Sequence, residues 1–257
     1  MNWLRKIYPL WLREKLYFHL IVRARLSLEE TSSFDLEFAP VNLRAILDTD
    51  YGHRQIAWIG FYELELSRRI SALAGKGGLM VDVGANAGYF SCIWASSGSP
   101  NQVYAFEPSP RNLSLLRKNI SSLDNPQRVK IFDYALGKEN GMLNFDVGPE
   151  DQSGWGGLAQ ARTARTIPVS VRRLDDFIDS ETNVSVLKID TEGADTWVLY
   201  GAEKALRQKR IRHIFFEGNL QRMRQLGIQA PEAERYLKDL GYSVRAFGAD
   251  EFYATPE

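Results

Sequence analysis

The sequence predicts an α/β protein with a doubly wound, mostly parallel seven-stranded sheet and an N-terminal helical extension. Apolar runs typical of strands alternate with helical patterns along most of the 257 residues. One run, Leu79–Val83, is bounded by glycines and is apolar except for Asp82, as in a strand buried on both faces of a parallel sheet. Two extended runs follow each other closely at the end of the chain, so they are expected to pair antiparallel at a sheet edge.

The elements are expected in a regular order. Residues 27–75 have apolar residues at helical spacings and are predicted to be mostly helical. After the first strand at 79–83, further strands are predicted at 102–106, 129–133, 184–189, 211–216, 242–247 and 251–254. Helices are predicted at 89–97, 110–123, 194–208 and 231–240. Two extended pieces, 142–147 and 166–171, flank the glycine-rich segment 153–157, and we expect an extension over 1–59 and one main domain over 60–257.

Composition excludes several classes of protein. Hydrophobic residues make up 44% and charged residues 25% of the chain, which is typical of a globular domain and not of a disordered, collagenous or disulfide-rich chain. Lys+Arg and Asp+Glu both total 32, so no bulk basic charge is available to bind nucleic acid. Cys92 is the only cysteine, and no run reaches the roughly 18 apolar residues of a membrane span. We therefore expect a cytoplasmic protein.

The N-terminal segment 1–26 has a local excess of positive charge. It holds six Lys or Arg residues and one acid, Glu14, among many apolar and aromatic residues. Such a helix fits a peripheral position on the inner membrane face or on a partner protein. The alternative is a helix whose apolar side packs on the protein's own core while its cations face solvent. The segment lacks the uninterrupted apolar stretch of a secretory signal.

A glycine-containing loop follows the first predicted strand. Gly84, Asn86 and Gly88 precede a predicted helix, and Glu107 ends the next predicted strand. Glycines allow close approach of a ligand to the backbone, and an acid at the end of the second strand can accept hydrogen bonds from a ribose diol. A dinucleotide site requires Gly-x-Gly-x-x-Gly, which Asn86 interrupts. Asp82 lies just before the loop and suits the α-ammonium of S-adenosylmethionine better than a diphosphate.

Several motifs together resemble one family, the FkbM-type S-adenosylmethionine-dependent methyltransferases. They are DVGANAGYFS at 82–91, FEPSP at 106–110, ALG at 135–137, LDDF at 174–177, LKIDTEGA at 187–194 and FEG at 216–218. The resemblance covers the chain from about residue 60 onward. It implies the Rossmann-like class I methyltransferase fold, S-adenosyl-L-methionine as cofactor, and methyl transfer to a hydroxyl of a sugar, glycan or polyketide-like natural product.

The resemblance also implies a set of cofactor-binding residues. It puts the glycine-containing loop at the methionine and ribose parts of the cofactor, Glu107 on the ribose hydroxyls, and Tyr134 and Ala135 beside the adenine. The full expected set is Asp82, Gly84, Ala85, Asn86, Gly88, Tyr89, Phe90, Glu107, Pro108, Tyr134, Ala135 and Asp190.

Candidate catalytic residues lie where predicted strands end. Asp190 and Glu192 follow one strand and Glu217 ends the next, and ligands bind at the carboxyl ends of strands in open α/β sheets. Lys188 lies two residues before Asp190 and therefore on the same strand face. We expect Asp190 or Glu217 to act as a general base or to position the acceptor, with Lys188 and Glu192 beside them. The alternative for Lys188 is a structural ion pair across adjacent strands.

Two further features bear on the acceptor and on metals. Asp190, Glu217 and Asn219 are hard oxygen ligands that could hold Mg²⁺, which would lower the pKa of an acceptor hydroxyl. Trp155, in the glycine-rich segment 153–157, could offer an apolar platform to a sugar, or the segment could be an ordinary turn. Alternative functions are a non-catalytic adenosine-binding or scaffold protein and a nicotinamide-linked oxidoreductase.

Overall fold

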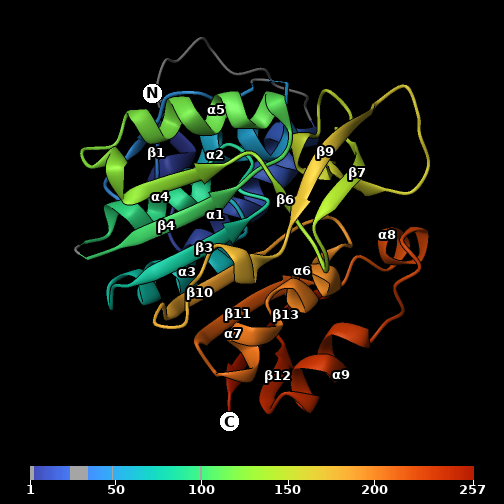
Figure 1. The fold of residues 1–257 in the computed structure, drawn as a ribbon. Helices are drawn as coiled ribbons and strands as arrows, with labels where there is room; N and C mark the ends of the chain where they lie inside the picture. The colour runs from blue at the N-terminus through green and yellow to red at the C-terminus, as the bar shows by residue number, and fades with distance from the viewer. Residues whose placement is uncertain (1–2, 24–33, 48, 99) are drawn as a thin grey trace.

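The computed structural model describes residues 3–23, 34–47, 49–98 and 100–257. Its centre is a seven-stranded sheet in the order β12-β13-β11-β10-β3-β4-β5, and a four-stranded sheet packs beside it in the order β6-β9-β7-β8 (Figure 1). The central strands are β3 (Leu79–Val83), β4 (Gln102–Phe106), β5 (Val129–Phe132), β10 (Val184–Ile189), β11 (Ile211–Glu217), β12 (Tyr242–Ala246) and β13 (Glu251–Pro256). All seven predicted strands of the main sheet are confirmed.

The central sheet is parallel except for β13, which runs antiparallel to both β11 and β12. The predicted antiparallel pair at the edge is therefore confirmed. The chain builds outward from β3 through β4 to β5, and then returns to the other side of β3 with β10 and β11. Ligands bind at such a reversal of strand order, in the crevice outside the carboxyl ends of the strands.

Helices cover both faces of the sheet (Figure 1). On one face α3 (Leu64–Ala74), α4 (Tyr89–Ser96) and α5 (Pro110–Ser121) pack over Met80, Val186 and Phe215. On the other face α6 (Asp195–Gly201), α7 (Glu203–Arg207) and α9 (Glu232–Asp239) pack over Val81, Leu187 and Ile214. Successive strand residues point to opposite faces, so two separate cores result.

One predicted helix is divided. The sequence predicts a single helix over 194–208, whereas α6 ends at Gly201 and α7 begins at Glu203. The Asp175 carboxylate accepts hydrogen bonds from the backbone N–H groups of Lys204 (2.9 Å) and Ala205 (3.1 Å). Because these groups lie in the first turn of α7, Asp175 caps a new helix start.

The first part of the chain differs from its prediction. The helical prediction for 27–75 is confirmed for α2 (Tyr51–Ile59) and α3, and residues 27–33 lie outside the described part of the chain. It is wrong for 34–43, where β1 (Phe34–Asp35) and β2 (Asn42–Leu43) form a two-stranded antiparallel sheet. Phe34 and Leu43 face each other in this pair and are both buried.

The N-terminal segment is helical and packs on the main core. It contains a 3₁₀ turn (Trp3–Lys6), α1 (Leu10–Leu16) and a π-helical turn (Tyr17–Val22); residues 1–2 and 24–26 of the predicted basic segment lie outside the described residues. Leu4, Tyr17 and Ile21 join the core on the α3–α5 side. Across the helices that the structure describes, none is long and apolar enough to cross a membrane.

The four-stranded sheet lies between β5 and β10 in the sequence. It consists of β6 (Ala135–Leu136), β7 (Gly141–Asp146), β8 (Gly157–Ala159) and β9 (Thr166–Arg172). The sequence predicted β7 and β9 as extended pieces but not β6, β8 or α8 (Leu220–Gln225). This small sheet has its own apolar core, which includes Phe145, Leu158, Val169 and Met223. It stands next to the carboxyl ends of the central strands, where the site lies (Figure 1).

Candidate functional site

The loop after β3 lies between the ends of β4 and β10. Gly84 has φ +74°, and a Cβ there would lie 1.9 Å from the backbone oxygen of Asp190, so only glycine fits this approach. The backbone N–H of Asn86 donates to Oε2 of Glu107 at 2.8 Å. The fold therefore brings the three predicted segments, at Gly84–Asn86, Glu107 and Asp190, to one place.

Glu107 is buried, and both of its carboxylate oxygens accept backbone hydrogen bonds. Besides Asn86, the N–H of Ser109 donates to Oε1 at 2.9 Å. Burial raises the pKa of Glu107 to about 7, although the two N–H groups act in the opposite direction. Each oxygen keeps a second lone pair for a ligand hydroxyl.

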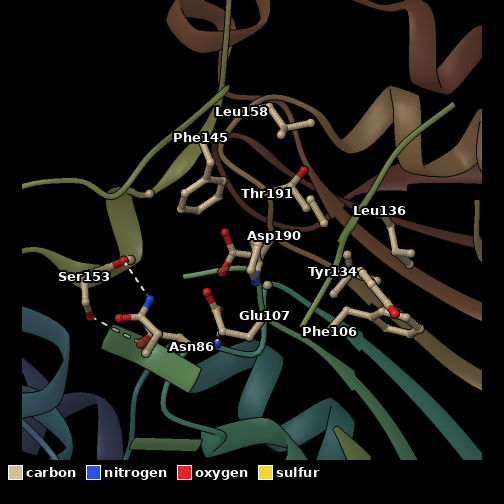
Figure 2. A pocket seen from close by; sticks show the side chains of 17 residues that line it. Asn86, Phe106, Glu107, Tyr134, Leu136, Phe145, Ser153, Leu158, Asp190 and Thr191 are labelled. Atoms are coloured by element: carbon tan, nitrogen blue, oxygen red, sulfur yellow. Dashed lines mark hydrogen bonds between the residues drawn. The ribbon is translucent and has the colours of Figure 1, made fainter. Parts of the chain in front are cut away.

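A first pocket opens above this carboxylate (Figure 2). Its polar lining residues are Asn86, Glu107, Asn112, Ser153, Asp190 and Thr191. Its apolar walls are Phe106, Tyr134, Leu136, Phe145 and Leu158. Phe145 and Leu158 come from the four-stranded sheet, and sequence reasoning missed them because nothing local indicates that β7 and β8 reach this site. A flat ring and a neighbouring diol, as in adenosine, fit such a lining.

A second pocket, larger than the first, adjoins it. Both pockets are lined by Gly84, Asn86, Gly154 and Asp190, so they meet at these residues. The second pocket is further lined by aromatic and acidic side chains, namely Tyr51, Tyr62, Tyr89, Phe90, Trp155, Glu63, Glu192 and Glu217, and by Lys188.

The predicted site residues divide between these pockets. Seven of the twelve expected cofactor-binding residues line the first pocket: Gly84, Asn86, Glu107, Pro108, Tyr134, Ala135 and Asp190. Ala85, Tyr89 and Phe90 line the second, as do all four candidate catalytic residues. Asp82 and Gly88 line neither pocket. A Cβ on Gly88 would lie 2.6 Å from Leu116 Cδ1, so this glycine permits close packing of the loop on α5.

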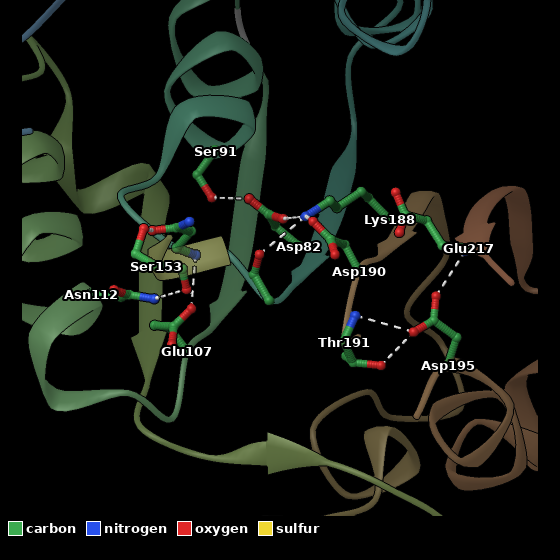
Figure 3. Close-up of polar contacts among 12 residues, drawn as sticks. Asp82, Ser91, Glu107, Asn112, Ser153, Lys188, Asp190, Thr191, Asp195 and Glu217 are labelled. Atoms are coloured by element: carbon green, nitrogen blue, oxygen red, sulfur yellow. Dashed lines mark hydrogen bonds and ion pairs between the residues drawn. The ribbon is translucent and has the colours of Figure 1, made fainter. Parts of the chain in front are cut away.

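Lys188 is held between two carboxylates (Figure 3). Its Nζ lies 3.5 Å from Oδ1 of Asp82 and 3.3 Å from Oδ2 of Asp190, and it donates to the Gly84 oxygen at 3.1 Å. Burial alone would lower the pKa of Lys188, but the charges of Asp190 and Asp82 outweigh it and raise this pKa. Asp82 is fully buried and also accepts from the Ser91 hydroxyl at 2.6 Å. Asp190 directly follows β10, the strand that holds Lys188, as the sequence indicates, and the alternative of an ion pair across adjacent strands is also formed, with Asp82 of β3.

The second pocket holds carboxyl groups that cannot all ionise. Burial and the charge of Asp190 raise the pKa of Glu217 to about 10, and the same two causes raise that of Glu192 to about 7. Glu63 has its pKa raised to about 8, again by burial first and then by Asp190. Because burial and the nearby negative charges both disfavour ionisation, Glu217 keeps its proton at neutral pH.

Glu63 is a pocket residue that sequence reasoning missed. It precedes α3 with φ +44°, a left-handed conformation that is costly for a residue with a side chain. No motif surrounds it, so the sequence contains no signal for its position beside Asp190 and Glu217.

The magnesium site expected from Asp190, Glu217 and Asn219 finds no support in the structure. Asn219 Oδ1 accepts from the backbone N–H of Arg222 at 3.2 Å and so caps α8, while its Nδ2 donates to Glu192 at 2.7 Å. Within the described residues, no group of three or more His, Cys, Asp or Glu side chains could hold a metal ion. The amide is turned into a helix cap rather than toward the two carboxylates.

The segment before β8 forms one wall of both pockets. The Ser153 N–H donates to Asp50 Oδ2 at 2.5 Å, and the Tyr51 N–H donates to the oxygen of Asp151 at 3.0 Å, which ties this segment to α2. On the other side, Arg222 donates to the Trp155 oxygen at 2.6 Å. Trp155 itself is half exposed and lines the second pocket.

Known proteins similar to this chain are methyltransferases by name. A family profile described as "Methyltransferase FkbM domain" matches residues 82–244. The 2-O-methyltransferase NoeI of Sinorhizobium fredii is 27% identical over 165 residues, which are 57% of this chain and 67% of that protein. Methyltransferase 1 of Beauveria bassiana is 28% identical over 145 residues, which are 48% of this chain and 58% of that protein. The solved structure of methyltransferase FkbM from Methylobacillus flagellatus KT aligns with 70% of this chain and 43% of its own, at 18% identity and a TM-score of 0.48.

Proposed function

This chain belongs to the FkbM methyltransferase family, and we propose that it is an S-adenosylmethionine-dependent O-methyltransferase acting on a hydroxyl of a sugar or glycan. The observation that carries this proposal is the meeting of two different pockets at Asp190. One pocket has the lining that an adenosine needs, and the other is larger and open to a polar acceptor. A transfer reaction requires its two reactants to meet in this way.

The first pocket would hold the cofactor's adenosine. Phe106, Tyr134 and Phe145 would enclose the adenine, and the Glu107 carboxylate would accept from the ribose hydroxyls. When bound, S-adenosylmethionine supplies a methyl group on a positively charged sulfur. The Asp190 carboxylate borders both pockets and would attract that charge.

Asp190 is also the group best placed to accept the proton that the acceptor hydroxyl loses. It is about a quarter exposed (28%), lines both pockets, and is oriented by Lys188. Glu217 holds its own proton at neutral pH, with its pKa near 10, so it would donate a hydrogen bond to the acceptor instead. This divides the two candidate roles between a base and a positioning residue.

The lining of the second pocket favours a sugar acceptor. Aromatic rings such as Trp155 and Tyr51 pack against the apolar faces of sugar rings, and Glu63 and Glu192 offer hydrogen-bond partners to sugar hydroxyls. The name 2-O-methyltransferase, carried by the relative from Sinorhizobium fredii, supports an oxygen as the accepting atom.

We expect labelled methyl groups to move from S-adenosylmethionine to one or more members of a panel of sugars and glycans, as alkali-stable ethers. Trp155→Ala is expected to raise KM for the sugar about tenfold, or about 1.4 kcal/mol, with kcat little changed, because the ring binds substrate and does no chemistry. Met142→Ala, an exposed apolar residue on β7, is the matched control and should leave KM unchanged. Label found only on non-sugar acceptors would contradict the sugar assignment.

A further inference from the structure

Half of the large exposed apolar side chains of the described residues lie in one short N-terminal segment. The described residues have ten such side chains, and five of the ten lie within residues 3–23, where they are between 38% and 66% exposed. They are Trp3, Tyr8, Trp11, Phe18 and Leu20. Tyr51 of α2, a sixth member of the ten, stacks on Phe18 with ring centroids 6.3 Å apart. Concentrations of exposed apolar surface of this kind mark interaction sites.

The exposed charges of the same segment are all positive. Lys6, Lys15 and Arg23 are exposed, and the one acid of residues 3–23, Glu14, is half-buried and within hydrogen-bond distance of the Gln55 side chain (3.3 Å). Two exposed acids lie on neighbouring elements: Asp35, whose backbone oxygen accepts from Arg5, and Asp151, which lines a pocket with Tyr17. Within residues 3–23 themselves, exposed rings and cations without an exposed acid are complementary to anionic lipid headgroups above an apolar layer.

The segment cannot rotate to bury these rings, because its other side is fixed to the body of the protein. Arg5 donates to the backbone oxygens of Asp35, Ile56 and Ala57. Arg13 is fully buried, pairs with Glu37 at 2.7 Å and donates to the Ile59 oxygen at 3.0 Å. The alternative in which one side of the segment packs on the protein's own core is therefore confirmed, while the outer side keeps its rings and cations exposed.

We propose that residues 3–23 dock the protein on an anionic lipid bilayer as a peripheral, non-spanning contact. The aromatic rings enter the interface and the three exposed cations pair with lipid headgroups. Tyr51 stacks on Phe18 and also lines the second pocket, so the docking surface continues to the edge of that pocket. A methyl acceptor carried on the same bilayer would be delivered beside the site.

Co-sedimentation of the full chain with phosphatidylcholine vesicles, with and without phosphatidylserine, tests the proposal. The wild-type protein is expected to sediment with the anionic vesicles and only weakly with the neutral ones. Lys6→Gln/Lys15→Gln is expected to lower the partition coefficient about thirtyfold, since the two cations near the surface contribute about 1 kcal/mol each. Trp3→Ser/Trp11→Ser should also abolish most binding, because the rings supply the apolar contact.

These variants change exposed side chains, so thermal unfolding and binding of S-adenosylhomocysteine should be unchanged. The matched control is Met142→Ser/Leu143→Ser, which removes exposed apolar groups from β7 and should leave sedimentation intact. Absence of wild-type sedimentation, or equal sedimentation of wild-type and tryptophan variants, would overturn the proposal. If residues 3–23 dock on another protein instead of a bilayer, the wild-type protein will not sediment with the vesicles. Neither outcome depends on whether the proposed methyl transfer is correct.

Discussion

Asp190→Asn is expected to lower kcat for methyl transfer by about 10²–10⁴-fold, the usual contribution of a general base. The amide keeps the size of the carboxylate but cannot accept the acceptor's proton. S-adenosylhomocysteine should still bind, because Glu107 and the apolar walls of the first pocket are untouched and its sulfur carries no positive charge for Asp190 to attract. The measurement is single-turnover transfer at saturating cofactor, with titration of S-adenosylhomocysteine in parallel.

Two further variants test whether the general base is Asp190 and not another acid. Glu217→Gln should retain most of kcat, because Glu217 already holds its proton at neutral pH, with its pKa near 10. Asp124→Asn changes an exposed acid between α5 and β5, at the opposite edge of the sheet, and should have no effect. Full activity of Asp190→Asn would exclude an essential charge there, and a larger loss in Glu217→Gln would move the base to that residue.

Lys188→Met is expected to lower the free energy of unfolding by about 3–5 kcal/mol, the range for removing one partner of a buried ion pair. Methionine fills the same volume, but Asp82 would keep a buried carboxylate whose Oδ1 has no hydrogen-bond partner apart from this ion pair at 3.5 Å. Urea denaturation checks the value. The control Lys118→Met removes an exposed lysine from α5. A change within about 0.5 kcal/mol, as for surface substitutions, would show that the ion pair is dispensable.

Local sequence predicts the strands and the loop of the first pocket well. The run Leu79–Val83 is apolar and bounded by glycines, and its burial on both faces needs no knowledge of distant partners. The positions of Gly84, Asn86 and Glu107 follow from the order strand, loop, helix, strand. The hydrogen bond from Asn86 to Glu107 confirms that this order brings the two residues together.

Features that depend on contacts between distant segments could not be predicted in this way. The walls formed by Phe145 and Leu158 require β7 to pair with β8 and β9 and the small sheet to stand beside the central one. Glu63 reaches Asp190 only through the tertiary packing of the segment before α3. The magnesium prediction was unsupported for a local reason, since Asn219 uses its carbonyl oxygen to cap α8.

In the region 27–75, which is predicted to be mostly helical, tertiary contacts override part of the local pattern. Leu43 has helical spacing with Ile46 and Leu47 in the sequence, but in the structure it faces Phe34 across a short antiparallel pair, and both residues are buried. For the N-terminal segment, the sequence alone is compatible both with packing on the protein's own core and with contact to a membrane or a partner. The buried side chains of Leu4, Tyr17 and Ile21 show which side faces the core.

Calorimetric titration with S-adenosylhomocysteine, beside NAD and beside Glu107→Ala, tests the central claim most directly. We expect roughly micromolar binding of S-adenosylhomocysteine, no binding of NAD, and a loss of about a hundredfold in affinity in Glu107→Ala, because two hydrogen bonds to a charged group disappear. Glu139→Ala removes an exposed acid and should bind like the wild type. Absence of S-adenosylhomocysteine binding, or a preference for NAD, would contradict the assignment of the first pocket and with it the proposed methyl transfer.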